Sequence, residues 1–271
     1  MKTISDVEVF AKRVFVRADL DVPLDFTAET YGLQPQSTRL GNLKETIDIL
    51  LDSKASQIII AGHIGRPKDT DGAFSTKQLL PHLEKILGRK VFFKAKFEEN
   101  VEGDIILFEN LRFWPGEVAK DPEFAKKLAG IADVYVNEAF GNSHRDHASM
   151  TLLPSLLAHA AGAHLRREVM ELSKLIDSPN RPFVALVGGA KIDTKLPVIQ
   201  NLAKIADTVL VGGELPVENQ KEAVKFKQNV IVGRLNAEQK DLQGDSIDDF
   251  KKTISSAKTI VWNGPMGLYE E

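Results

Sequence analysis

The stretch Pro182–Lys195, PFVALVGGAKIDTK, joins a short apolar run to a glycine pair and a helical pattern. Phe183–Val187 is apolar throughout and too short for a helix, which predicts a strand buried on both faces. Gly188 and Gly189 then permit a sharp turn and leave backbone N–H groups open to an anion. Helical spacing begins near Asp193, so the stretch predicts a strand, a turn and a helix N-terminus arranged as a phosphate cradle.

Two lysines follow the glycine pair. Lys191 and Lys195 are four residues apart, so they lie on one face of the predicted helix near its positive end. An ordinary strand-to-helix turn with two solvated lysines has the same local pattern, because glycine-rich turns are common in α/β folds. The G-x-x-x-x-G-K-[ST] spacing of a Walker loop is absent. On this stretch alone, the cradle and the ordinary turn both remain open.

The composition limits the classes of function. The 271 residues, 43% of them hydrophobic and 27% charged, suit one large or two modest domains with a sizeable core. A formal net charge of −3 argues against wholesale binding to nucleic acid or an anionic membrane, so any anion site must be local. With no cysteine, disulfides and thiolate chemistry are excluded. No signal peptide or membrane-spanning run is present, and we expect a cytoplasmic protein.

Apolar runs and helical patterns alternate along the chain. Strands are expected at residues 14–17, 57–61, 91–93, 105–108, 134–136, 183–187, 208–211, 230–232 and 259–262. The alternation predicts an α/β fold of two Rossmann-like parallel-sheet αβα lobes. A helical region over 149–177 is expected to connect them. The expected division is a first lobe at 1–160, a helical hinge at 161–181 and a second lobe at 182–271.

Basic residues follow the predicted strands of the first lobe, where ligands of open parallel sheets bind. These residues are Arg39, His63, Arg66, Arg112, His144, Arg145 and His147. Four arginines from separate loops resemble a socket for a ligand with several negative charges, because guanidinium groups match phosphate and carboxylate oxygens.

Each of these residues also has a plainer interpretation. A lone loop arginine is more often a solvated surface group, and a lone histidine is more often a structural hydrogen-bonding group. Asp19 and Asp21 can simply shape a turn. The histidines together with Asp19 or Asp146 match no standard ligand spacing, so no metal site is predicted among the side chains.

Six motifs occur in one order from residue 17 to residue 267. They are Arg17–Pro23, Gly62–Pro67, Glu109–Phe113, Asn137–Gly141 with His144-Arg145, Gly188–Lys191 with Lys195, and Trp262–Gly267. This series closely resembles the phosphoglycerate kinase family and thins only between Glu214 and Ser256. The resemblance implies a monomeric, two-lobed glycolytic kinase. Its N-terminal lobe would bind 3-phosphoglycerate or 1,3-bisphosphoglycerate, its C-terminal lobe Mg-ADP or Mg-ATP, and hinge closure would bring them together.

The resemblance also implies roles for individual residues. The substrate-binding residues would be Asp19, Leu20, Asp21, Arg39, His63, Ile64, Gly65, Arg66, Arg112 and Arg145. The nucleotide-binding residues would be Gly189, Lys191, Lys195, Gly212, Gly213, Asn263 and Glu270. Arg39 and Lys191 would be catalytic, Arg39 by steadying the transferred phosphoryl group and Lys191 by neutralising its developing charge. Phosphoryl transfer indeed asks the protein mainly for positioning and positive charge.

The sequence departs from the family pattern in three places. Asp21 stands where the family usually has Asn, which puts an acid beside an anionic substrate. After Gly212-Gly213 the family has a third glycine, whereas this chain has Glu214, and the stretch from there to Trp262 is shorter than usual. Beyond the last motif the family has a Gly-Gly-Gly-Asp-Thr turn whose Asp binds magnesium. We therefore expect an incomplete second lobe with an uncovered sheet edge. The alternative is a truncated or reduced relative that binds phosphoglycerate with little or no kinase activity.

Overall fold

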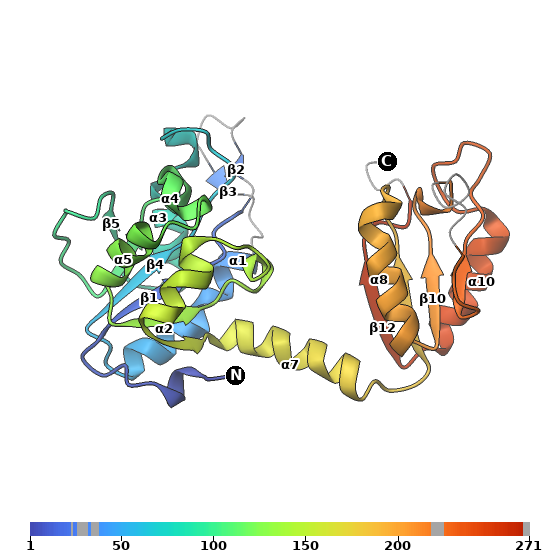
Figure 1. Ribbon diagram of the computed structural model, residues 1–271, viewed down its shortest axis with the longest axis horizontal. Helices are drawn as coiled ribbons and strands as arrows, with labels where there is room; N and C mark the ends of the chain where they lie inside the picture. The colour runs from blue at the N-terminus through green and yellow to red at the C-terminus, as the bar shows by residue number, and fades with distance from the viewer. Residues whose placement is uncertain (23, 26–31, 34–37, 218–224, 268–271) are drawn as a thin grey trace. The chain divides into compact units, whose positions relative to one another are not determined.

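The computed structural model describes residues 1–22, 24–25, 32–33, 38–217 and 225–267 (Figure 1). The chain forms two compact units, Met1–Met170 and Glu171–Glu271. Each is built on a parallel sheet, with the smaller sheet in the second unit, so the predicted α/β class is confirmed.

Unit 1 contains a six-stranded parallel sheet in the order β5-β6-β4-β1-β7-β8. The strands are β1 (Arg13–Arg17), β4 (Gln57–Ala61), β5 (Phe92–Lys94), β6 (Ile105–Phe108), β7 (Val134–Asn137) and β8 (Ala158–Ala161). A two-stranded antiparallel sheet of β2 (Leu24–Asp25) and β3 (Gly32–Leu33) completes the described strands of this unit. β1 pairs with both β4 and β7, so the loops after these three strands meet at one edge of the sheet.

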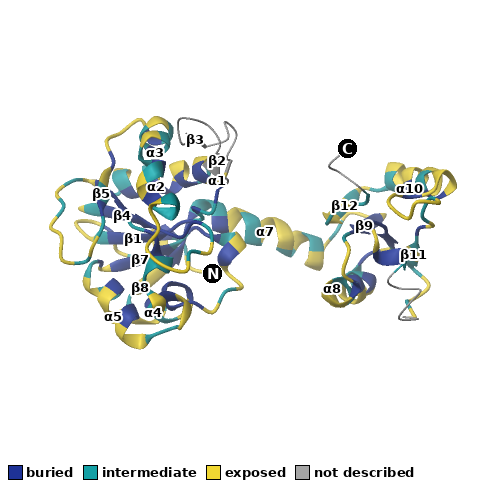
Figure 2. Cartoon of the chain, turned by 90° about the horizontal axis from the view of Figure 1, so that it is seen from above, coloured by how far each residue is buried: buried dark blue, intermediate teal, exposed yellow. Residues whose placement is uncertain are grey.

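Helices cover both faces of this sheet. They are α1 (Thr38–Gly41), α2 (Leu43–Asp52), α3 (Leu80–Leu87), α4 (Pro115–Val118), α5 (Pro122–Gly130) and α6 (Leu153–Leu156). Val14 and Val16 of β1 pack in a cluster with residues of α2 and α3, whereas Phe15 packs with residues of α5 and α6. The strand is apolar from Val14 to Val16 because both of its faces are buried there, and Figure 2 shows the buried residues along the strands.

The region 149–177 is not one helix, so that prediction was wrong. A π-helical turn (Ala148–Leu152) leads into α6, the chain then becomes extended as β8, and α7 (Ala163–Asp177) follows. β8 is alanine-rich, and alanine favours helices. Its pairing with β7, from Val134 opposite Ala158 to Asn137 opposite Ala161, overrides that local preference. α7 begins in unit 1 and ends in unit 2.

Unit 2 contains a four-stranded parallel sheet in the order β11-β10-β9-β12. Its elements are β9 (Phe183–Val187), α8 (Ile192–Ile205), β10 (Thr208–Val211), β11 (Val230–Val232), α10 (Gly244–Ser256) and β12 (Thr259–Asn263). α8 packs on one face of β9 and α10 on the other. Among the described strands β12 lies at the edge, and its Trp262 is 65% exposed, as expected for an uncovered edge.

Candidate functional site

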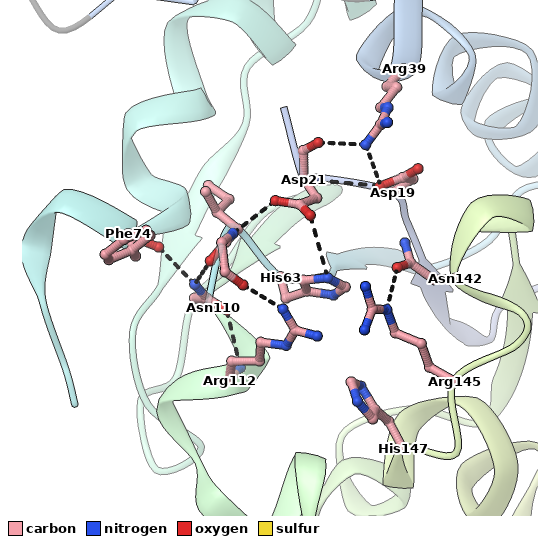
Figure 3. Close-up of polar contacts among 12 residues, drawn as sticks. Asp19, Asp21, Arg39, His63, Phe74, Asn110, Arg112, Asn142, Arg145 and His147 are labelled. Atoms are coloured by element: carbon pink, nitrogen blue, oxygen red, sulfur yellow. Dashed lines mark hydrogen bonds and ion pairs between the residues drawn. The ribbon is translucent and has the colours of Figure 1, made fainter. Parts of the chain in front are cut away.

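The predicted basic residues of unit 1 gather at the carboxyl ends of adjacent strands. Asp19 and Asp21 follow β1, His63 and Arg66 follow β4, Arg112 follows β6, and Arg145 lies in the loop after β7. Because β6, β4, β1 and β7 are neighbours in the sheet, these loops share one edge. Figure 3 shows the guanidinium groups of Arg112 and Arg145 directed toward the same space beside His63 and His147. We call Asp19, Asp21, Arg39, His63, Arg66, Arg112 and Arg145 the basic socket.

Buried Asn110 holds the loops after β4 and β6 together. Its side-chain amide donates hydrogen bonds to the carbonyl oxygens of Ile64 (2.9 Å) and Phe74 (2.8 Å), and its Oδ1 accepts from the backbone N–H of Arg112 (3.0 Å). The Arg112 guanidinium also donates to the carbonyl of Gly65. The position of Arg112 is therefore fixed before any ligand arrives, as a preorganised site requires.

The loop after β1 is held through Asp21. Its Oδ1 accepts a hydrogen bond from the backbone N–H of Gly65 at 2.8 Å, and its carbonyl accepts one from Arg39 Nη1 at 2.6 Å. Arg39 also lies 3.6 Å from Asp19, and its side chain is 53% exposed. A cavity of about 220 Å³ beside Asp19 and Arg39 extends to Glu138, which follows β7, and to His164 at the start of α7. Arg39 therefore lies at a solvent-accessible part of a partly closed site.

Two other predicted substrate-binding residues are buried. The side chains of Leu20 and Ile64 belong to the apolar cluster shared with α2 and α3. Only the backbone of these residues is available to a ligand. Arg66, in contrast, is exposed, and the neighbouring Gly65 has a left-handed φ of 60°. A Cβ at Gly65 would lie 2.4 Å from the ring of Phe74, so glycine is required there.

The socket concentrates positive charge in a partly buried space. Burial, followed by the charges of Arg17 and Arg112, lowers the pKa of His63 to about 2. Burial and the charge of Arg145 likewise lower the pKa of Arg112. His63 is therefore neutral at physiological pH, and the arginines repel one another. An anionic ligand would relieve that repulsion, so the arrangement favours a ligand with several negative charges.

A buried polar layer that the sequence did not predict lies beneath the socket. Arg17, Glu117 and Ser149 are fully buried, and none was predicted as a site residue. The one available signal was Arg17, a charged residue at the end of an apolar strand run. Glu117 lies in α4 and Ser149 in the π-helical turn, and only the fold brings them together. His147 joins this layer, with its ring centroid 6.3 Å from that of His63, whereas His144 is exposed.

The predicted nucleotide-binding residues of unit 2 also lie at strand ends. Gly188 and Gly189 follow β9, Gly212 and Gly213 follow β10, and Asn263 ends β12. Three backbone bonds tie these loops together: Gly188 N–H to Asn263 O, Gly213 N–H to Met266 O, and Glu214 N–H to Gly189 O, each 2.9 Å. We call these three loops the glycine cradle.

Glycine is required in the cradle because its loops touch through their backbones. A Cβ at Gly188 would lie 1.9 Å from the carbonyl oxygen of Pro265. Gly213 has a φ of 67°, and a Cβ there would lie 2.6 Å from the nitrogen of Gly189. The glycines thus permit close approach of the loops as well as the sharp turn expected from the sequence.

The cradle brings together Lys195 and Asn263 but leaves Lys191 free of side-chain partners among the described contacts. Lys195 Nζ donates to Asn263 Oδ1 at 2.7 Å. Lys191 is exposed at the N-cap position of α8, next to the glycine turn. Both ammonium groups therefore lie near the positive end of α8. Glu270 lies outside the described residues.

The described part of the chain contains no group of three or more His, Cys, Asp or Glu side chains that could hold a metal ion. None of its helices is both long enough and apolar enough to cross a membrane.

Sequence comparisons point to one family. The family model described as phosphoglycerate kinase matches residues 4–220 and 214–271. A phosphoglycerate kinase of Desulforudis audaxviator is 35% identical over 325 residues, covering 99% of this chain and 81% of that protein. The cytosolic phosphoglycerate kinase of Triticum aestivum is 34% identical over 325 residues, covering 99% of this chain and 80% of that protein.

Structural comparison agrees. The structure of phosphoglycerate kinase from Coxiella burnetii matches with a TM-score of 0.80 and 26% identity, covering 99% of this chain and 81% of that one. Phosphoglycerate kinase from Pyrococcus horikoshii matches with a TM-score of 0.82 over 100% of this chain and 82% of that one; at 23% identity, this match speaks for the fold alone.

The matches also locate a difference from the relatives. The two family-model matches meet at residues 214–220, and the aligned span of 325 residues exceeds the 271 residues of this chain. The relatives therefore contain residues inside this span that have no counterpart here. This agrees with the shortened stretch expected between Gly213 and Trp262, and it places the difference next to the glycine cradle.

Proposed function

The chain belongs to the phosphoglycerate kinase family, and from this premise we propose that it transfers a phosphoryl group reversibly between 1,3-bisphosphoglycerate and ADP, giving 3-phosphoglycerate and ATP. The observation that carries the proposal is the basic socket. Four arginines and a neutral histidine from separate loops share one edge of the unit 1 sheet, where repulsion among the arginines favours a multiply charged anion.

Each part of the site has a task in this reaction. The socket binds the glycerate carboxylate and phosphate, with Arg39, an exposed arginine, near the moving phosphoryl group. Lys195 holds nucleotide phosphates at the start of α8, and Lys191 neutralises charge that develops during transfer. An acyl phosphate is already a reactive donor, so no side-chain nucleophile is needed. The protein contributes positioning, positive charge and exclusion of water.

Magnesium is used with the nucleotide in this family. The glycine cradle offers backbone N–H and ammonium groups, which suit phosphate oxygens and not a cation. The described residues also lack a cluster of metal-binding side chains. We therefore propose that the ion arrives on the nucleotide phosphate oxygens, keeping water ligands. No step of the reaction is assigned to a metal ligand of this chain.

The proposal divides the chain into three parts. They are a phosphoglycerate-binding lobe at 1–160, a hinge at 161–181 and a nucleotide-binding lobe at 182–271. Transfer requires the two ligands to meet, which is the task we give to the hinge. The protein is proposed to be a cytoplasmic monomer whose partners are these small molecules, with Glu270 among its nucleotide contacts.

The proposal is tested by supplying the full 271-residue chain with 1,3-bisphosphoglycerate and Mg-ADP and measuring ATP formation. Turnover is expected. In parallel, calorimetry with 3-phosphoglycerate measures the socket alone. Arg66→Ala should weaken that binding by about 1.5–3 kcal/mol, the loss of a charged hydrogen bond. Arg89→Ala removes another exposed arginine outside the socket and should leave binding unchanged.

A second candidate function is a phosphoglycerate-binding protein with little kinase activity. It is favoured by one observation, the residues missing relative to the relatives beside Gly213, at the edge of the glycine cradle. The same experiment separates the two functions. Binding of 3-phosphoglycerate without ATP formation would support the second candidate, and turnover comparable to that of an intact relative would exclude it.

A further inference from the structure

The tautomer of His63 is determined by its buried neighbour. Its Nδ1 lies 3.0 Å from Nη2 of Arg17, and both side chains are almost completely buried. A guanidinium group can only donate hydrogen bonds. Nδ1 must therefore accept, and the single proton of the neutral ring must be on Nε2.

Arg17 is itself held in place by Ser149 of the buried layer and by the backbone of Ala18. Its Nε donates to Ser149 Oγ at 2.9 Å, and its Nη1 donates to the Ala18 carbonyl at 2.6 Å. Ser149 in turn donates to Glu117 twice, from Oγ to Oε1 at 2.6 Å and from the backbone N–H to Oε2 at 3.0 Å. The hydrogen bonds thus form a line from Glu117 through Ser149 and Arg17 to His63.

This line joins four separate segments of unit 1. Glu117 lies in α4, Ser149 in the π-helical turn, Arg17 at the end of β1 and His63 after β4. Burial alone would raise the pKa of Glu117, but His147, the charge of Arg17 and the hydrogen bonds from Ser149 hold it below its ordinary value. Glu117 is therefore ionised and balances the buried charge of Arg17. The paired charge offsets the free-energy cost of burying Arg17 away from water.

The other ring nitrogen of His63 has no partner. Nε2 is buried without a hydrogen bond, and the nearest carboxylate oxygen, Asp21 Oδ2, is 3.9 Å away, too far for one. The charged groups around the ring are Arg17, Arg112, Arg145 and Asp21, with His147 also adjacent. An unsatisfied buried donor costs free energy, which a ligand acceptor would recover.

We propose that Arg17, positioned by Ser149 and Glu117, fixes His63 as the neutral tautomer with its proton on Nε2, so that His63 donates a hydrogen bond to an oxygen of the acidic ligand in the socket. The identity of that ligand as a phosphoglycerate rests on the proposed function. Arg17, Ser149 and Glu117 are positioning residues, because none of them is exposed to the socket. His63 adds a directional donor without adding a charge to the repelling arginines.

The test is an NMR measurement of the two ring nitrogens of His63 in the full ¹⁵N-labelled chain without ligand, assigned with His63→Gln. Nδ1 should be unprotonated and Nε2 protonated, with no titration between about pH 5.5 and 8, the range that spans the ordinary histidine pKa. A protonated Nδ1, or titration near the ordinary pKa, would overturn the proposal. This result does not depend on catalysis, so its failure is distinct from failure of the proposed function.

Variants then test the role of the buried line. Arg17→Lys keeps the charge but cannot reach both Ser149 and His63, so both tautomers should appear, and Kd for 3-phosphoglycerate should rise about tenfold. Ser149→Ala should give a smaller shift in the same direction and serves if Arg17→Lys does not fold. Ser155→Ala is the matched control, because Ser155 is exposed and its hydroxyl donates a hydrogen bond to the Leu152 carbonyl. It should change neither the tautomer of His63 nor Kd for 3-phosphoglycerate. An unchanged His63 spectrum in both Arg17→Lys and Ser149→Ala would overturn the positioning role.

Discussion

The two anion sites of this chain are built differently. In unit 1 the basic socket consists of charged side chains, backed by Asn110 and by the buried line from Glu117 to His63. In unit 2 the glycine cradle consists of backbone groups from three loops, and its two lysines are at the surface or partly exposed. One site is specified by charge placement, the other by how closely main chains approach.

This difference determines which changes each site can tolerate. The socket depends on individual side chains, so loss of one arginine or histidine removes one contact and leaves the buried support in place. The cradle depends on the absence of side chains, so a single Cβ at Gly188 or Gly213 disturbs all three loops. The two family-model matches also meet at residues 214–220, beside the cradle and not beside the socket. Changes in unit 2 are therefore expected to affect nucleotide use before phosphoglycerate binding.

The largest effect is expected from Lys191→Ala. Lys191 has the cradle's exposed ammonium group, and its proposed task exists only during transfer. The variant should lose about 2–4 kcal/mol of transition-state stabilisation, seen as a fall in kcat with little change in either KM. Steady-state kinetics on the full chain measures both.

Lys204→Ala is the matched control, since Lys204 lies in the last turn of the same helix and bonds to Asn201. It should leave kcat unchanged. An equal loss of binding and rate in Lys191→Ala would contradict a role confined to the transition state and would make the lysine part of ground-state nucleotide binding.

Gly188→Ala tests the backbone side of the comparison. The new methyl group would overlap the Pro265 carbonyl, so the loops after β9 and β12 must separate. We expect unit 2 to lose about 1–3 kcal/mol of unfolding free energy, as in other overpacked sites, together with weaker nucleotide binding. Urea unfolding and calorimetry with ADP measure the two effects, and 3-phosphoglycerate binding should be retained.

Gly244→Ala is the corresponding control, because nothing lies within 4 Å of a Cβ at that position in the first residue of α10. It should be neutral or slightly stabilising, since alanine favours a helix more than glycine does. Equal effects of the two substitutions would contradict the close approach of the loop after β12 to Gly188.

The sequence was informative where residues act locally. The apolar runs predicted β1, β4, β6, β9 and β10 closely, because the central residues of these strands are buried on both faces and must be apolar. β11 was predicted as well, although Ile231 at its centre is exposed. The stretch after β9 left a phosphate cradle and an ordinary turn both open, and the other two cradle loops were expected only from the family resemblance. The basic residues of the socket were predicted from their positions after strands. β8 was missed because alanine-rich sequence favours a helix locally, and only pairing with β7 makes Ala158–Ala161 extended.

The buried line was missed for a different reason. Glu117, Ser149 and Arg17 are far apart in the sequence, and no spacing rule connects them. Their roles follow from hydrogen bonds across three segments, which exist only in the folded chain. Charges placed at a surface edge can be predicted from topology, whereas the buried groups that orient them need the packed structure.

The pH dependence of stability tests whether His63 is held neutral. Its folded pKa, lowered to about 2, lies below the ordinary value of about 6.5, so below pH 6.5 the unfolded chain binds a proton that the folded chain does not. Unfolding free energy should therefore fall as pH falls, by about 2 kcal/mol between pH 7 and pH 5 for this group.

The comparison to make is between the wild type and His63→Gln in urea unfolding at several pH values. His63→Gln should remove this contribution to the change of unfolding free energy with pH. His144→Gln, at an exposed histidine, should keep it. Identical slopes in the wild type and His63→Gln would show that His63 is protonated in the folded chain.

The smallest effect is expected from Asp21→Asn, which changes the charge of the socket without changing its shape. Asparagine retains the Oδ1 acceptor for the backbone N–H of Gly65, and it removes a negative charge 3.9 Å from His63. The partly exposed position weakens the electrostatic effect, so 3-phosphoglycerate should bind tighter by only about 1 kcal/mol. Calorimetry at two salt concentrations should show this gain in binding free energy shrinking at high salt.

Asp48→Asn is the control, at an exposed aspartate that pairs with Lys44, and it should not tighten the binding of 3-phosphoglycerate. Weaker binding by Asp21→Asn would mean that the carboxylate accepts a hydrogen bond from the ligand and is part of the site's specificity, making the socket dependent on an acid as well as on its arginines.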